Sequence, residues 1–207
     1  MLNSKDIANA LYEIKAIQIR PDRSFVWTSG IHSPIYCDNR LTMSYPDVRK
    51  KIVQHFAKML EEMDVKPDVI AGCATAGIPH AAWLADYLEL PMVYVRSKPK
   101  GHGKKNQIEG KIAPGDKVIV IEDLISTGGS SLESALVLRE AGAEILSVLA
   151  IFSYGLNKAD VQFNQAAIPF STITSFDVLA DALVEKGEIT IDEKQNLLEW
   201  RDDLGNN

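Results

Sequence analysis

Two neighbouring carboxylates and the glycine turn after them are the residues of this chain best suited to chemistry. Glu122 and Asp123 can bind the vicinal hydroxyls of a sugar, and burying them is costly unless a cationic or hydrogen-bonding partner meets them. The turn STGGSS, from Ser126 to Ser131, offers hydroxyls and N–H groups with little steric bulk, as a phosphate requires. This stretch therefore predicts a phosphorylated pentose as ligand. The simpler alternative is an ordinary strand–turn–helix junction with a capped helix.

A second segment with phosphate-binding character, GCATAGIPHA, runs from Gly72 to Ala81. It follows a predicted strand and opens a predicted helix, which is the arrangement that holds anions at helix N-termini. The alternative is close packing of an ordinary strand–helix turn. The small residues that would let a ligand approach the backbone are Ala74, Thr75, Ala76 and Gly77.

Positive charge is concentrated in one short segment, RSKPKGHGKKNQIEG. Its basic residues cannot be buried without an anion, and its glycines disfavour regular structure. We therefore expect a loop that stays mobile until a polyanion binds, with a solvated surface hairpin as the alternative. The basic residues are Arg96, Lys98, Lys100, His102, Lys104 and Lys105.

The elements that must position these segments alternate between strand and helix. The β-branched stretch Lys117–Ile121 predicts a buried strand that ends where the carboxylates begin. A helix is expected from about Gly129 to Ala141, because Ser130 and Glu133 have the spacing of a capping box, and Gly142 is expected as its C-cap.

Further strands are expected at 68–72, 92–96 and 145–152, and a strand and two helices from Phe170 onward, the last helix capped near Thr190. Apolar strands alternating with helices indicate an α/β fold with a mostly parallel sheet, whose strand–helix turns meet at one edge. Towards the N-terminus, helices are expected at about 3–17 and 46–63, and short strands at 24–27 and 34–37.

Composition limits the classes of function. A length of 207 residues suits a single domain, 1–207, with a small N-terminal piece of about 1–45 attached to a core of about 46–207. A net charge of −6 and a pI near 5.3 argue against extended nucleic-acid binding. The chain has neither an apolar run long enough for a membrane span nor a secretory signal. Cys37 and Cys73 lie far apart without a CxxC, as expected for a reducing cytoplasm.

The stretch VIVIEDLISTGGS closely resembles the thirteen-residue phosphoribosyl-pyrophosphate (PRPP) signature of the type I phosphoribosyltransferases. With FVWTSGIHSPIYCDNR (Phe25 to Arg40), GCATAGIP and the basic segment, the resemblance covers roughly residues 20 to 155 and is strongest to the orotate-specific members. It implies the type I phosphoribosyltransferase fold: a mostly parallel sheet flanked by helices, an N-terminal hood and a mobile basic loop.

The resemblance also implies an activity, the transfer of the 5-phosphoribosyl group from PRPP to orotate in pyrimidine (UMP) biosynthesis. Lys100, His102 and Asp123 are then expected to be catalytic, Ser126 to contact orotate, and the loop Ala74–Gly77 to hold pyrophosphate. Mg²⁺ is expected to be held mainly by PRPP rather than by a protein cage. A cytoplasmic homodimer is expected, in which each basic loop reaches the neighbouring subunit's site. The expected PRPP-binding residues are Arg96, Lys100, His102, Glu122, Asp123, Leu124, Ile125, Ser126, Thr127, Gly128, Gly129 and Ser130.

Departures from the family pattern and rival functions remain open at this point. Many relatives carry lysines where this chain has Thr28 and Ala76, and the segment SYGLNKAD lacks an arginine that some use for orotate. Tyr36 and Phe25 fit either a wall of the pyrimidine site or the core, whereas His32, His55 and His80 are interpreted as structural or surface residues. The rivals are a purine phosphoribosyltransferase and a non-catalytic PRPP-sensing regulator that binds nucleic acid. The absence of GxxxxGK[ST] excludes a Walker-type nucleotidase.

Overall fold

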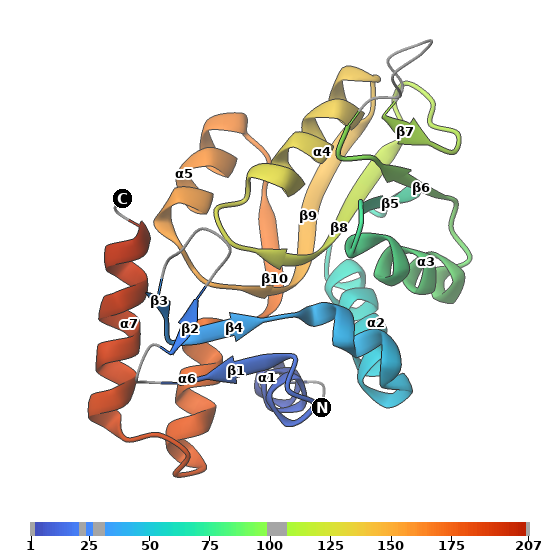
Figure 1. Cartoon of the computed structure of the whole chain (residues 1–207). Coiled ribbons are helices and arrows are strands. Elements are labelled where there is room, and N and C mark those ends of the chain that lie inside the picture. The colour runs from blue at the N-terminus through green and yellow to red at the C-terminus, as the bar shows by residue number, and fades with distance from the viewer. Residues whose placement is uncertain (1–2, 21–23, 27–31, 99–106, 206–207) are drawn as a thin grey trace.

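The computed structural model describes residues 3–20, 24–26, 32–98 and 107–205. Its centre is a six-stranded sheet in the order β10-β9-β8-β5-β6-β7 (Figure 1). All neighbours from β10 to β6 are parallel, and β7 pairs antiparallel with β6. This confirms the predicted mostly parallel α/β sheet. Its strands are β5 (Val69–Cys73), β6 (Met92–Val95), β7 (Ile108–Glu109), β8 (Lys117–Ile125), β9 (Glu144–Ser153) and β10 (Phe170–Ser175).

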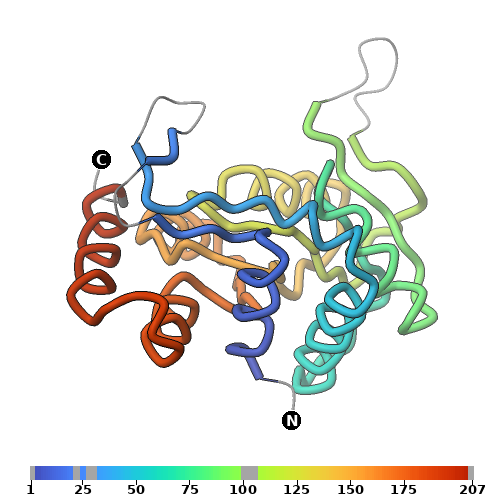
Figure 2. The backbone as a smooth tube through the Cα atoms, turned by 60° about the horizontal axis from the view of Figure 1, so that its bottom comes forward, coloured from blue at the N-terminus to red at the C-terminus, as the bar shows by residue number. Residues whose placement is uncertain are grey.

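Helices cover both faces of this sheet (Figures 1 and 2). One face packs against α4 (Gly129–Glu140) and α5 (Asn157–Ala166). The other packs against a larger set of helices: α1 (Ser4–Glu13), α2 (Pro46–Glu61), α3 (Gly77–Leu88), α6 (Phe176–Glu185) and α7 (Ile191–Gly205). Strand β8 serves both layers, because Val118 and Val120 lie in the first core and Ile119 and Ile121 in the second. Each of these fully buried side chains contributes roughly 1.5–3 kcal/mol.

An N-terminal segment, here called the hood, lies at the edge of the sheet where the parallel strands end (Figure 1). It consists of two small antiparallel pairs and one 3₁₀ helix. The pairs are β1 (Ile17–Ile19) with β4 (Ile35–Cys37), and β2 (Phe25–Val26) with β3 (His32–Ser33), and the 3₁₀ helix is η1 (Asn39–Ser44).

Three predicted boundaries are wrong. The first helix ends at Glu13 instead of about residue 17, because Lys15 has a left-handed φ of 61° and the chain re-enters as β1. Strand β8 does not stop at Ile121 but continues to Ile125, because it keeps β9 as a partner after β5 has ended. The glutamate and aspartate therefore lie within the strand. Strand β7 and helix α5 had not been expected at all.

The third error concerns the start of α4. Its N-cap is Gly128, not Ser130, and no side chain caps it, so the predicted capping box is absent. Gly128 has a φ of +83°, and an added Cβ would lie 2.8 Å from the Phe163 ring. Another cap signal is confirmed. Thr190 forms a reciprocal capping box with Glu193 at the start of α7. The C-cap of α4 is Ala141 rather than the expected Gly142, which follows it with a left-handed φ of +97° and ends the helix.

Within the described ranges, no helix combines the length and apolarity needed to cross a bilayer.

Candidate functional site

The acidic pair lies near the carboxyl end of β8, among buried groups. Glu122 is 6% exposed, and its Oε1 accepts a hydrogen bond from the Asp123 N–H at 3.0 Å. Its Oε2 accepts from the Ser130 hydroxyl at 3.4 Å, which ties the pair to the first turn of α4. Burial, and then the Asp123 charge, raise the pKa of Glu122 to about 8. Burial also raises the pKa of Asp123. Near neutral pH the pair therefore retains a proton until a cation or a hydrogen-bonding ligand arrives.

The sheet itself explains why this position is polar. Pairing of β8 with β5 ends at Ile121, whereas pairing with β9 continues to Ile125. Lys117 directs its N–H and carbonyl to Asp68 beside β5, so alternate residues of β8, including Asp123, face that side. At Asp123 no β5 residue remains opposite. Its N–H is taken by Glu122, and its carbonyl oxygen accepts from Asn39 Nδ2 at 2.7 Å.

The loop Ala74–Gly77 joins β5 to α3 and lies against the acidic strand. The Ala74 N–H donates to the Val95 carbonyl at 2.9 Å, so this amide is engaged by the protein. The Ala74–Thr75 peptide is cis. A Cβ added to Gly77 would lie 2.3 Å from the Ile121 carbonyl oxygen and 3.2 Å from Glu122 Cα. The glycine is thus required for the loop to approach β8, and the fold brings together the two segments that the sequence had singled out separately.

The turn after β8 offers backbone amides at the start of α4. The first intrahelical bond of α4 runs from the Leu132 N–H to the Gly128 carbonyl at 2.9 Å. Amides that precede Leu132 therefore have no intrahelical acceptor. Nothing lies within 4 Å of a Cβ added to Gly129, so this glycine borders open space, in contrast to Gly128. An anion at this position would meet both these amides and the positive end of the helix.

The remaining residues predicted in this stretch differ in exposure. Thr127, Gly129 and Ser130 are exposed, and Ser126 is half-buried. Leu124 is also half-buried and packs against the core shared with α1, α2 and α3, while Ile125 is fully buried in the core on the α4 and α5 side of the sheet. The side chain of Ile125 is therefore unavailable to a ligand, and any part it takes in binding must come from its backbone.

The basic segment is described only at its two ends. Arg96 donates its N–H to the Gln107 carbonyl at 2.8 Å, and Gln107 Nε2 donates back to the Arg96 carbonyl at 3.2 Å. The Arg96 guanidinium pairs with Glu109 at 3.3 Å, a partner that sequence reasoning missed. Lys100 and His102 lie outside the described residues, as does Thr28.

The hood contributes polar residues that had not been singled out. Asn39 is 1% exposed and holds the Asp123 carbonyl, as described above. Arg40 forms two bonds with the Asp38 carboxylate, at 2.6 and 2.9 Å. Whereas burial raises the pKa of Asp123, the Arg40 charge opposes that rise, so this cation lies within electrostatic reach of the pair. The one available signal was their place in the matched segment Phe25–Arg40.

Several open side-chain assignments can now be decided. Tyr36 is 40% exposed and its ring centroid lies 5.9 Å from that of Phe25, so Tyr36 is not a core residue. His55 is a structural residue, because its Nδ1 lies 2.8 Å from the Lys51 carbonyl and its Nε2 3.3 Å from the Asn3 carbonyl. His80 is 1% exposed and therefore also structural, and His32 is exposed.

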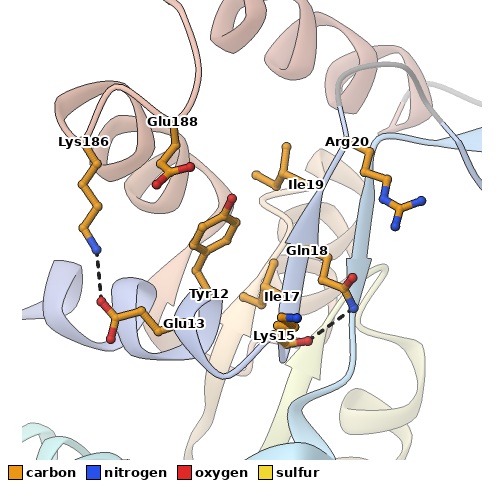
Figure 3. Close-up of a pocket in the computed structure, with 9 residues that line it drawn as sticks. All are labelled: Tyr12, Glu13, Lys15, Ile17, Gln18, Ile19, Arg20, Lys186 and Glu188. Atoms are coloured by element: carbon orange, nitrogen blue, oxygen red, sulfur yellow. Dashed lines mark hydrogen bonds and ion pairs between the residues drawn. The ribbon is translucent and has the colours of Figure 1, made fainter.

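A separate cavity of about 460 Å³ lies between β1, α1 and the turn after α6 (Figure 3). Tyr12, Ile17 and Ile19 line it, and the Lys186–Glu13 ion pair bridges its rim at 3.2 Å. None of the predicted site residues lines this cavity. The predicted site residues thus lie apart from this cavity.

The carboxylates of the site are the side chains that could contact a metal ion. Within the described part of the chain, no three or more histidine, cysteine, aspartate or glutamate side chains form a cluster suited to a metal. Glu122 and Asp123 nevertheless offer adjacent carboxylate oxygens, the donor type that Mg²⁺ prefers. These two residues fit a Mg²⁺ ion that takes most of its ligands from elsewhere.

Known proteins are similar to this chain in sequence and in architecture. The family model for the phosphoribosyl transferase domain matches residues 44–171. An orotate phosphoribosyltransferase of Oceanobacillus iheyensis is 61% identical over 201 residues, which cover 97% of this chain and 100% of that protein.

Solved structures agree with this result. The crystal structure of orotate phosphoribosyltransferase from Aeropyrum pernix gives a TM-score of 0.75 at 27% identity, covering 88% of this chain and 99% of that one. Leishmania donovani UMP synthase gives 0.78 at 28% identity over 96% of this chain, which spans 42% of that longer chain. The family model over residues 44–171 and the near full-length match at 61% identity lead to one assignment: the chain belongs to the orotate phosphoribosyltransferase family.

Proposed function

We propose that this chain transfers the 5-phosphoribosyl group of PRPP to orotate, giving orotidine 5′-phosphate and pyrophosphate in UMP biosynthesis. One structural observation carries the proposal. The pair of buried Glu122 and half-buried Asp123 lies between two backbone segments suited to anions, the loop Ala74–Gly77 and the start of α4. PRPP carries a phosphate at one end, a pyrophosphate at the other and two hydroxyls between them. The order of groups in the site matches the order of groups in the substrate.

Each part of the site is assigned one part of PRPP. The 5-phosphate would lie at the turn 126–130, where the amides that precede Leu132 have no helical acceptor. The ribose hydroxyls would bind Glu122 and Asp123, and the pyrophosphate would lie along residues 74–77. Ser126 at the turn is assigned to orotate, and the exposed Tyr36 to the wall of the base site.

The reaction requires charge stabilisation more than covalent chemistry. N1 of orotate loses its proton to solvent and forms a bond to C1 of the ribose as the bond from C1 to the pyrophosphate oxygen breaks, and positive charge develops on the ring. The carboxylate of Asp123, held in a buried environment, stabilises that charge more strongly than it would in water. Lys100 and His102 are assigned to the departing pyrophosphate, with His102 as proton donor. Arg96, at the start of the basic loop, is also assigned to PRPP binding.

Mg²⁺ is proposed as the metal cofactor, and when bound it would neutralise pyrophosphate oxygens. Among the described residues, Glu122 and Asp123 carry the side chains best suited to contact this Mg²⁺ ion. Their shared proton would be lost to solvent as Mg²⁺ binds, because a nearby cation favours the ionised form of a carboxylate.

The assembly is proposed as well. We infer a cytoplasmic homodimer in which the basic loop of one subunit completes the site of the other. Residues 1–207 would act as one catalytic domain, with an N-terminal helix and hood segment of about 1–45 attached to a core of about 46–207. A mixing experiment tests the shared site. Lys100→Ala and Asp123→Asn variants, each strongly impaired alone, should regain activity when their subunits are exchanged, because one hybrid site then has both residues intact.

The activity is tested by product formation. The purified chain, with PRPP and Mg²⁺, should consume orotate and release pyrophosphate, and it should leave hypoxanthine and xanthine unchanged. Asp123→Asn should lower kcat/KM by roughly two orders of magnitude, because charge stabilisation of that size is typical of preorganised sites. Asp160→Asn, on the exposed side of α5, is the matched control. Turnover of a purine but not of orotate would refute the proposal.

A further inference from the structure

We infer that Asn39 is a positioning residue for phosphoribosyl transfer, which fixes the acidic strand by holding the Asp123 carbonyl. The inference rests on the proposed function and adds to it a residue outside the signature. Asn39 is the first residue of η1 and is separated from Asp123 by 84 positions in the sequence. It is 1% exposed, and its Nδ2 lies 2.7 Å from the carbonyl oxygen. A carbonyl can only accept, so the amide orientation is fixed by chemistry.

The position of this bond explains its importance. Pairing of β8 with β5 ends at Ile121, so Asp123 has no β5 partner that would hold its carbonyl. The Asn39 amide replaces that partner. The same stretch of backbone carries the Asp123 N–H that binds Glu122 Oε1 at 3.0 Å. A shift of this backbone would therefore move both carboxylates of the pair together.

Asn39 is itself held from a second side. Its carbonyl oxygen accepts from the Thr42 hydroxyl at 2.6 Å, and Thr42 is fully buried. The Thr42 oxygen also lies 3.3 Å from His80 Nε2. Because the single hydroxyl hydrogen is used on Asn39, the Thr42 oxygen must accept there, so His80 carries its proton on Nε2. Burial lowers the pKa of His80 to about 4, which keeps this ring neutral at physiological pH.

The chain of bonds links three parts of the site. His80 belongs to α3, which begins directly after the loop Ala74–Gly77. The hood, the pyrophosphate loop and the acidic strand are thus tied through Asn39 and Thr42. Asn39 Oδ1 is buried and has no hydrogen-bond partner within the described residues. This unpaired acceptor lies on the residue that holds the Asp123 backbone, inside the protein and out of contact with solvent.

The test compares variants that remove the same kind of bond in different places. Asn39→Ala removes a buried side-chain bond to a backbone carbonyl at the site. Ser147→Ala removes one between β9 and β10, where the Ser147 hydroxyl donates to the Pro169 carbonyl at 3.1 Å. In urea unfolding, both variants should lose a similar amount of unfolding free energy. Only Asn39→Ala should raise the KM for PRPP, by about tenfold or more, with the KM for orotate within about twofold of wild type.

Thr42 supplies a second test should Asn39→Ala fail to fold. Thr42→Val should raise the KM for PRPP in the same direction, and Thr42→Ser, which keeps the hydroxyl, should restore it. Equal KM values for PRPP in wild type, Thr42→Val and Asn39→Ala would overturn the inference, as would an equal rise of the KM for PRPP in Asn39→Ala and Ser147→Ala. Wild-type turnover of orotate separates this outcome from failure of the proposed function, which would leave the wild type itself inactive.

Discussion

Replacing Glu122 by glutamine should stabilise the ligand-free protein at alkaline pH. Burial first, and then the Asp123 charge, raise the pKa of Glu122 from 4.5 to about 8. A folded-state pKa above the unfolded value means that stability is present below about pH 4.5 and is lost as the pH rises through about 8. At ~1.36 kcal/mol per pKa unit, the full difference sets a ceiling of about 5 kcal/mol. Because the raised pKa is divided between two coupled carboxyl groups, we expect Glu122→Gln to be more stable than the wild type by about 2–3 kcal/mol at alkaline pH.

Glutamine imitates the protonated acid. It keeps an oxygen for the Asp123 N–H, and the Ser130 hydroxyl can rotate to accept from the new amide. Urea unfolding at about pH 5.5 and about pH 8.5 measures the effect. The wild type should lose more stability than Glu122→Gln between these two values. Glu144→Gln, at the exposed start of β9, is the control and should follow the wild type.

Two outcomes would refute this reasoning. Parallel pH profiles for the wild type and Glu122→Gln would mean that Glu122 is already ionised in the folded protein. A Glu144→Gln profile equal to that of Glu122→Gln would mean that the effect comes from net charge rather than from burial. In activity assays, Glu122→Gln should lower kcat/KM for PRPP by roughly 10–100-fold, because the variant cannot supply the negative charge of the pair.

Further predictions separate structural glycines and caps from residues that contact substrate. Gly77→Ala should cost about 3 kcal/mol or more in urea unfolding, because its Cβ would lie 2.3 Å from the Ile121 carbonyl oxygen. Gly129→Ala, where nothing lies within 4 Å of the new Cβ, should fold as well as wild type yet raise the KM for PRPP, and an unchanged KM would argue against a phosphate at this turn. Thr190→Ala should cost about 1 kcal/mol of stability, because it breaks the capping box of α7, and should leave turnover unchanged. Lys100→Ala should lower kcat by roughly 100-fold with little change in stability, and full turnover would remove the basic loop from the mechanism.

The class of fold followed from the sequence alone, and the sequence also predicted which residues form the site. Alternation of apolar strands with helices predicted the parallel sheet, because strands buried on both faces read as continuous apolar runs. The acidic pair and the glycine turn stood together in one continuous stretch, so their ligand class could be predicted without a structure. Thr190 with Glu193 was equally readable, since a helix cap depends only on residues a few positions apart.

Other features depended on contacts between residues distant in the sequence. The acidic pair lies inside β8 because β9 continues where β5 stops, and no local pattern reports how long a neighbouring strand is. Gly128 replaced the expected Ser130 as the cap of α4 because the turn must pass Phe163 on another helix. The sequence alone could not identify Asn39, since its hydrogen bond to the Asp123 carbonyl joins two residues that are 84 positions apart and meet only in the folded chain. Local physics thus determined which groups would do the chemistry, and tertiary packing determined which groups would hold them in place.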